Sequence, residues 1–401
     1  MRAAAVSRSA SLRFSLALAV APALVSASCQ RSGDSRPPDQ AAATATTPTG
    51  ATGYCRRSGA TTPVGGPSAT GPSASEPSAS EPSATGPIDG DPLRPAHTFS
   101  IVARDPATGD LGVAVQSHWF AVGSTVTWAE PGVGAVATQS FVDPAYGPRG
   151  LALMRGGSPP ADALAKLLAA DAAREVRQVA FVDASGRAAA HTGGKCIEHA
   201  GHHVGAGYSV QANMMGTDRV VPAMSRAYEG ARGDLAERLM SALEAAQAAG
   251  GDIRGCQSAA LLVVSGTRSE KPWADTRFDL RVDDSPDPIG ELRRLLRLAR
   301  AYDHMNRGDA AVEKGDMNGA LDHYGAAARM SGGDSEMLYW QAVALAAHGD
   351  IDHALPLFRR VFADDPRWIE LTRRLTRPGI LPDTPEGRAM VERITREAAP
   401  R

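Results

Sequence analysis

The sequence predicts an α+β protein in which antiparallel β-strands are covered by helices and are followed by a helical repeat. Short apolar segments recur in pairs that are joined by turns containing Pro or Gly, as in β-hairpins. Helical segments stand between these pairs, without the regular strand–helix–strand alternation of a parallel sheet. Near the C-terminus a seven-residue motif recurs at an offset of 34 residues.

The composition excludes one class of partner. The chain has 401 residues, enough for two or three domains. Its formal net charge is −2, so no overall basic field attracts nucleic acid, and we expect no nucleic-acid partner. Aromatic residues make up only 5%, which favours close packing of small side chains over an aromatic binding platform.

Residues 1–29 resemble a signal peptide of the lipoprotein type. Basic residues precede an apolar segment at 14–27 that has the length of a signal-peptide core and is short for a permanent membrane span. Small residues then lead to Cys29, as in a bacterial lipobox, although Ser26 stands where Leu is usual. We expect an exported protein in the periplasm or at the cell surface, anchored to the membrane by a lipid on Cys29. Simple cleavage near the same point is the alternative.

Residues 30–96 predict a disordered linker. The segment is rich in Pro, Ser, Thr, Ala and Gly, and a five-residue Pro-Ser-Ala-Ser/Thr-Gly/Glu unit recurs within it. Pro has no N–H to donate and the other residues offer little to bury, so the segment has no basis for a core. It therefore separates the folded part from the anchor.

Residues 97–286 form the predicted α+β domain. Segments 97–104 and 110–117 read as a first hairpin, and 124–130 and 133–140 as a second. A helix follows at 158–171, with Ser158 as N-cap. The remaining expected elements are strands at 176–182 and 187–190, helices at 220–228 and 234–248, and strands at 258–265 and 278–283.

Residues 287–401 form the predicted helical module. The motifs GDMNGAL and GDIDHAL begin at Gly315 and Gly349, which is the tetratricopeptide period. A small residue and an aromatic residue recur in the same register: Ala320 and Ala354, Tyr324 and Phe358. We expect a tetratricopeptide-like module whose groove takes a protein partner. A helical hairpin with accidental periodicity is the alternative.

Thr98 is the main catalytic candidate, because it opens the first apolar strand directly after the linker. A cut before Thr98 would place its hydroxyl beside its own α-amine, whose pKa near 8 suits a general base. One residue would then supply both nucleophile and base. Without the cut, Thr98 is an ordinary β-forming residue, and neither Thr98 nor Ser100 has an amine base.

Several motifs resemble domain-of-unknown-function family 1028 over about residues 97–300. They include TFSIVARD (98–105), GVAVQS (112–117), GVGAVATQ (132–139), AGHHVGAGYSVQANMM (200–215) and GDIRGCQSAALLV (251–263). The resemblance implies the four-layer αββα sandwich of the N-terminal-nucleophile hydrolases, with Thr98 at the position of the nucleophile. The activity of the family is unassigned, so the resemblance bears on fold more than on function. In one departure from related proteasome-type enzymes, no lysine lies between Thr98 and Lys166.

Polar side chains at strand ends supply the other candidates. Asn213 lies in a Gly-rich stretch suited to holding an oxyanion. The candidate substrate-binding residues are Ser117, His118, Gln139, His191 and Gln211. These residues favour an amidohydrolase of the N-terminal-nucleophile type. The alternative is a non-catalytic envelope module that binds a small amide-containing ligand or a cell-wall fragment.

The sequence predicts neither a cofactor nor a metal. Cys196, His199, His202 and His203 have ligand-like spacing, but no second cluster completes a zinc site, so His202 is only a weak candidate. Walker A and Rossmann motifs are missing from the sequence. Cys196 and Cys256 could pair or remain separate thiols. A homo-oligomer is compatible with the sequence.

Overall fold

The computed structural model describes residues 98–400, and these confirm an α+β protein with two antiparallel sheets. The six-stranded sheet has the order β10–β9–β2–β1–β8–β7, and the four-stranded sheet has the order β3–β4–β5–β6. The strands are β1 (Thr98–Arg104), β2 (Leu111–Ser117), β3 (Thr127–Glu130), β4 (Gly134–Ser140), β5 (Arg177–Asp183), β6 (Ala188–Thr192), β7 (Gly201–Gly205), β8 (Tyr208–Ala212), β9 (Ser258–Val264) and β10 (Thr276–Val282). The expected signal peptide, the linker and Cys29 lie outside the described residues.

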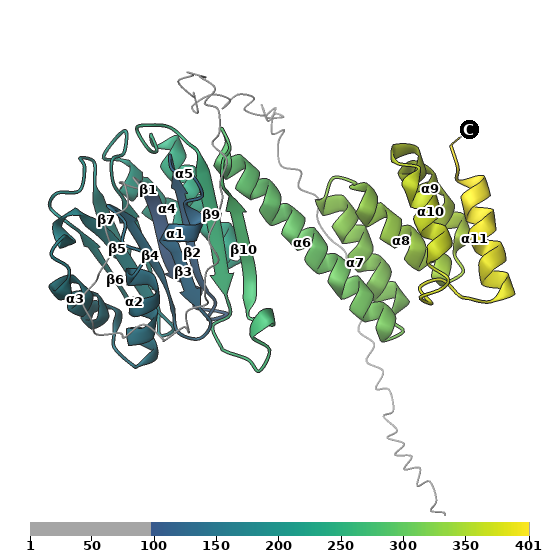
Figure 1. Cartoon of the computed structure of the whole chain (residues 1–401), viewed down its shortest axis with the longest axis horizontal. Helices are drawn as coiled ribbons and strands as arrows, with labels where there is room; N and C mark the ends of the chain where they lie inside the picture. The colour runs from purple at the N-terminus through teal and green to yellow at the C-terminus, as the bar shows by residue number, and fades with distance from the viewer. Residues whose placement is uncertain (1–97, 401) are drawn as a thin grey trace, which may run out of the picture. The chain divides into compact units, whose positions relative to one another are not determined.

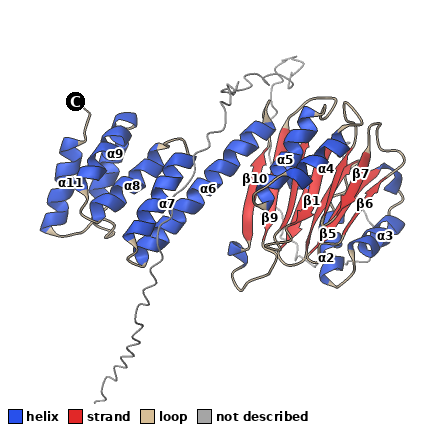
Figure 2. Cartoon of the chain, turned by 180° about the vertical axis from the view of Figure 1, so that it is seen from behind, coloured by secondary structure: helices blue, strands red, loops and turns tan. Residues whose placement is uncertain are grey.

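Helices cover the outer faces of both sheets. Two of them, α4 (Val220–Gly230) and α5 (Leu235–Ala248), pack on the six-stranded sheet (Figures 1 and 2). On the four-stranded sheet lie α2 (Tyr146–Arg155) and α3 (Pro160–Ala170). The short α1 (Gly123–Val126) contributes Val126 to the layer between the sheets.

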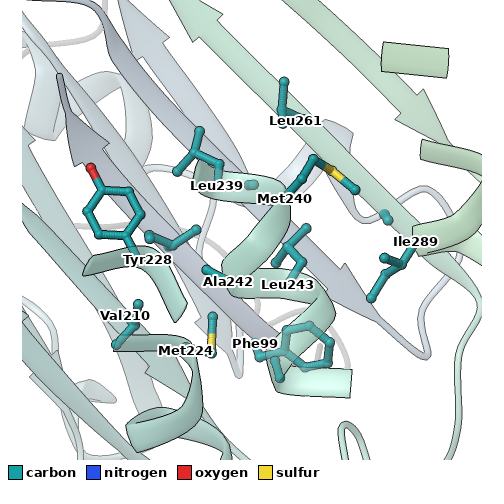
Figure 3. Packing of buried hydrophobic residues seen from close by; sticks show 14 of the residues in the cluster. Phe99, Val210, Met224, Tyr228, Leu239, Met240, Ala242, Leu243, Leu261 and Ile289 are labelled. Atoms are coloured by element: carbon teal, nitrogen blue, oxygen red, sulfur yellow. The ribbon is translucent and has the colours of Figure 1, made fainter. Parts of the chain in front are cut away.

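The period-two alternation of β1 shows how the layers form. Phe99 and Ile101 pack among the residues of α4 and α5, and Figure 3 shows Phe99 beside Met224 and Leu243 in this core. Val102 belongs instead to the apolar cluster between the sheets. A central strand buried on both faces therefore presents one set of residues to the helices and the other set to the second sheet.

The C-terminal part of the chain is helical. It contains α6 (Pro288–Glu313), α7 (Met317–Met330), α8 (Ser335–Ala347), α9 (Ile351–Asp364), α10 (Arg367–Arg374) and α11 (Pro385–Glu397). The first half of α6 buries Leu292 and Leu296 in the core of the α+β domain, whereas Ala301 and Met305 belong to the helical core. The predicted boundary at 286/287 coincides with the start of a helix that serves both cores.

Four local predictions differ from the structure. Ser158 is not the N-cap of the helix expected at 158–171: α3 begins at Pro160, Pro159 occupies the N-cap position, and no side chain caps the helix. Residues 201–205 and 208–212, expected only as a Gly-rich stretch, form the β7–β8 hairpin. α2 was not expected, and the start of the predicted strand 124–130 is instead part of α1. Short, Gly-containing segments carry a weak hydrophobic period, so tertiary pairing decides their structure.

No helix among the described residues combines the length and apolar character that a membrane span requires.

Candidate functional site

The space between the two sheets is apolar at one end and polar at the other. Valine, leucine and alanine side chains fill the apolar end. At the end where β1 begins, hydroxyl and amide side chains take their place. We call this set the polar cluster: Thr98, Ser100, Ser117, Gln139, Gln178, Gln211 and Asn213, all fully buried.

The polar cluster includes six of the residues singled out from the sequence as strand-end candidates or hydroxyls on β1. Ser100 Oγ donates to Gln139 Oε1 at 2.6 Å, which links the two sheets. Gln211 Nε2 donates to Ser100 Oγ at 2.6 Å, and Gln211 Oε1 accepts from Ser209 Oγ at 3.0 Å. Hydrogen bonds satisfy these buried polar atoms, which is the condition for keeping them in a core.

Gln178 has the most side-chain hydrogen bonds in the polar cluster, and it was not among the candidates identified from the sequence. Its Oε1 accepts from Gln139 Nε2 at 2.7 Å and from Asn213 Nδ2 at 2.8 Å. Its Nε2 donates to Thr192 Oγ1 at 2.9 Å and to the carbonyl oxygens of Gly201 and Ala212. The sequence did contain a signal for it. Gln178 is a polar residue near the start of the apolar segment 176–182, and it takes the same face of the strand as Ala180 and Val182.

Thr98 lies at the edge of the polar cluster with its side chain between the sheets. Its Oγ1 donates to Ser117 Oγ at 3.3 Å. Its carbonyl oxygen accepts from the Asn213 backbone N at 3.1 Å and from Gln139 Nε2 at 3.2 Å. The predicted nucleophile, which has 0% exposure, thus contacts a hydroxyl of its own sheet through Oγ1 and an amide of the other sheet through its carbonyl oxygen.

Two candidates are held elsewhere. His118 follows β2 directly, but its backbone N donates to Asp252 and its ring Nδ1 lies 3.4 Å from the Cys256 carbonyl oxygen. His191 Nε2 lies 2.9 Å from the Arg174 carbonyl oxygen. His191 lies on the same face of β6 as Ala189, which packs toward α2 and α3, so the structure does not bring His191 to the polar cluster.

His202 touches the edge of the polar cluster through Thr192. Thr192 Oγ1 accepts from Gln178 Nε2 at 2.9 Å and lies 2.8 Å from His202 Nδ1. Burial, together with the nearby His191 and His203, lowers the pKa of His202 and so favours a neutral ring. Within residues 98–400 no group of three His, Cys, Asp or Glu side chains is placed to hold a metal ion.

The two cysteines of the domain do not pair with each other. Cys196 is a free thiol, whereas Cys256 is disulfide-bonded. Both expected alternatives, a Cys196–Cys256 bridge and two separate thiols, are therefore wrong. Burial raises the pKa of the Cys196 thiol, and its Sγ lies 3.4 Å from the Arg177 carbonyl oxygen, so the thiol is held as a packed neutral group.

The helical part has a groove of its own, with a volume of about 600 Å³. Residues of α6 and α8 line it, including Met305, Asp309, Glu336 and Trp340. At the rim of the groove, the Tyr302 hydroxyl donates a hydrogen bond to Glu336 Oε2 at 2.7 Å. Apolar walls and acidic side chains suit a partner with apolar and basic groups.

Comparisons with known proteins point to one family. The model of a family of unknown function, DUF1028, matches residues 98–292. A crystal structure of protein SPO2555 from Silicibacter pomeroyi, which carries the same family name, is 34% identical to this chain. That comparison covers 50% of this chain and 88% of the other, with a TM-score of 0.46. No curated protein matches the chain.

Proposed function

The chain belongs to the DUF1028 family, and on this premise we propose that it is an exported amidohydrolase of the N-terminal-nucleophile type. The order of helix layer, sheet, sheet and helix layer supports assigning residues 97–286 to the four-layer αββα sandwich of those hydrolases. The starts of α7 and α9, 34 residues apart, support a tetratricopeptide-like module in residues 287–401.

One observation carries the catalytic proposal: Thr98 Oγ1 lies between the sheets, at the polar end, on the first described residue of the central strand. Cleavage of the His97–Thr98 bond would leave an α-amine on the same residue as this hydroxyl. The amine would take the Oγ1 proton as Oγ1 attacks an amide carbonyl carbon. Collapse of the tetrahedral intermediate then breaks the C–N bond, and the ammonium returns its proton to the leaving amine. Water finally hydrolyses the ester.

The neighbouring amides have roles in this scheme. Asn213 Nδ2 donates to Gln178 Oε1 in the uncleaved chain and would turn to the oxyanion when a substrate is bound. Ser117 Oγ accepts a hydrogen bond from the Thr98 hydroxyl in the resting state and so orients Oγ1. Because Thr98 is fully buried before cleavage, the cut has to expose the residue as well as create the amine.

The test combines intact mass with a covalent probe. The mature protein should include a chain that begins at Thr98, and an alkyl β-lactone should acylate that threonine through ring opening by Oγ1. Thr98→Ala should abolish the adduct, and Thr98→Ser should keep it. Thr138→Ala is the matched control, because Thr138 is equally buried but donates to the Asp143 carbonyl oxygen. If no chain begins at Thr98, the nucleophile has no base and the enzyme proposal fails.

The burial of Thr98 supports a second candidate, a non-catalytic module that binds a small amide-containing ligand or a cell-wall fragment. A fully buried hydroxyl with its hydrogen bond made is the normal condition of a structural residue. This reading gains if the β-lactone leaves the chain unmodified while the Thr98→Ala variant unfolds at a lower temperature than the parent, as expected when a buried hydrogen bond is lost.

Export and partners complete the proposal. A lipid on Cys29 would tether the protein in the periplasm or at the cell surface, and the groove of the helical part would take a protein partner. Cys29→Ser should abolish the incorporation of labelled palmitate during expression in bacteria, and equal labelling of the variant would refute the anchor.

A further inference from the structure

A second hollow, with a volume of about 520 Å³, lies at the end of the sheets opposite the polar cluster. It is lined by the turn between β3 and β4, the end of α2, the turn between β5 and β6, and the loop between β9 and β10. Three arginines from three of these elements face it: Arg155, Arg187 and Arg268. We call it the arginine hollow.

Glu130 holds two of the arginines in place. Its Oε1 accepts from Arg155 Nε at 2.9 Å and from Arg268 Nη2 at 2.7 Å. The Glu130 side chain is only 12% exposed, whereas those of Arg155 and Arg268 are 52% and 61% exposed. The Glu130 carboxylate is therefore mostly buried, whereas the two guanidinium groups that it binds are in contact with solvent.

Asp183 holds the third arginine in the same way. It accepts from Arg187 Nε at 2.7 Å, and its other oxygen accepts from the backbone N of Ser185 and of Arg187 at 2.9 Å each. The Asp183 side chain is 7% exposed and that of Arg187 is 55% exposed. Buried carboxylates thus orient exposed guanidinium groups on both sides of the hollow.

The sheet sets the distance between the two carboxylates. Glu130 pairs with Gly134 on β4, and Gly134 pairs with Asp183 on β5. Two strand spacings separate Glu130 from Asp183, or roughly 10 Å. Gly134 between them must remain glycine, because a Cβ there would lie 2.5 Å from the Val182 carbonyl oxygen and 2.8 Å from Met154 Cε.

We propose that the arginine hollow binds a small molecule that carries two anionic groups, one held by Arg268 and the other by Arg187. Three guanidinium groups against two carboxylates leave one net positive charge in the hollow. Each guanidinium has five N–H donors in a planar fork, which suits phosphate and carboxylate oxygens. A diphosphate and a dicarboxylate share this chemistry. The site is separate from the polar cluster and does not depend on the function proposed for Thr98.

The experiment is calorimetric titration of the full chain with two probes, pyrophosphate and succinate, in 50 mM and 300 mM NaCl. At least one probe should bind, and more weakly at the higher salt concentration because the arginines are exposed. Arg187→Gln and Arg268→Gln should each weaken binding at least tenfold. Binding of pyrophosphate alone would identify a phosphorylated ligand, and binding of succinate alone a dicarboxylate.

The variants are chosen to keep the fold. Arg268→Gln leaves Arg155 on Glu130, and Arg187→Gln leaves Asp183 with its two backbone donors. Arg268→Lys keeps the positive charge but lacks the planar fork of N–H donors, and it should bind with intermediate affinity.

Two controls lie outside the hollow. Arg294→Gln removes an exposed, ion-paired arginine on α6 and should bind as the parent does. Thr98→Ala should also bind as the parent, which separates this site from the catalytic proposal. If neither probe binds at millimolar concentration, or if the Arg187 and Arg268 variants bind like the parent, the proposal is overturned.

Discussion

Two buried glutamines show how differently the same residue type can be used. Gln178 makes hydrogen bonds with both ends of its amide between the sheets. Gln116 lies on the helix-facing side of β2, and within the described residues neither its Oε1 nor its Nε2 has a hydrogen-bond partner. A buried amide that is satisfied stabilises its surroundings, and one that is not satisfied costs free energy.

This contrast predicts opposite effects of one substitution. Gln178→Leu should lower the free energy of unfolding by about 2–3 kcal/mol, because it strands the amides of Gln139 and Asn213. Gln116→Leu, the matched control, should leave stability unchanged or raise it. Urea unfolding followed by circular dichroism measures both. Equal losses in the two variants would contradict the hydrogen-bond account.

At the scale of the element, aspartate caps order the C-terminal helices. Asp316 accepts from Gly319 N at the start of α7, and Asp350 accepts from His353 N at the start of α9. Such caps satisfy backbone N–H groups that have no partner within the helix. They are also the residues of the repeated Gly-Asp motif, so the sequence period marks helix starts.

The α6–α7 contact contains a pair of histidines. His304 Nδ1 lies 3.0 Å from His323 Nδ1, a distance at which one proton can be shared and two repel. Burial lowers the pKa of His304, the His323 ring and the Arg307 and Arg329 guanidinium groups lower it further, and Asp303 acts in the opposite direction.

This pair predicts a pH dependence of stability. The pKa of His304 is lower in the folded than in the unfolded chain, so the unfolded chain binds more protons below the ordinary pKa of 6.5. Stability from this group is complete above that pH and is lost as the pH falls below it. His323→Gln should therefore reduce the drop in Tm between pH 7.5 and pH 5.5. His348→Gln, an exposed histidine at the end of α8, is the control and should leave the drop unchanged. A drop of the same size in the His323 variant would rule the pair out as the cause.

For the whole molecule, the helix that opens the C-terminal part also completes the core of the α+β domain. Leu292 and Leu296 are fully buried beside residues of α5 and β9, and Ala301 is buried in the next core along the same helix. The domain boundary predicted from the sequence, at 286/287, therefore separates these leucines from the surface of the α+β domain that they cover.

Two fragments test this sharing. Residues 30–286 should be less stable than residues 30–300 by at least about 3 kcal/mol, since the shorter fragment exposes the surface beneath two leucines. Thermal unfolding of both fragments measures the difference. Equal Tm values would show that the first half of α6 adds nothing to the domain.

The paired β-rich apolar segments at 97–104 and 110–117 and the turn between them, together with the 34-residue period, were enough to predict the α+β class and the change to helices, because these patterns are local. The β7–β8 hairpin was not predictable in this way. Its segments hold glycine and adjacent histidines, and pairing with β1 decides their structure.

The sequence by itself determined that hydroxyl and amide residues stand at the starts and ends of the strands. It also determined which face of the strand each one takes, since side chains alternate between the two faces with a period of two residues. Only the tertiary structure decided which of them meet. Ser100 and Gln139, or Gln178 and Asn213, come together because two separate sheets stack face to face. That stacking depends on side chains packed from many distant segments, which no local pattern contains.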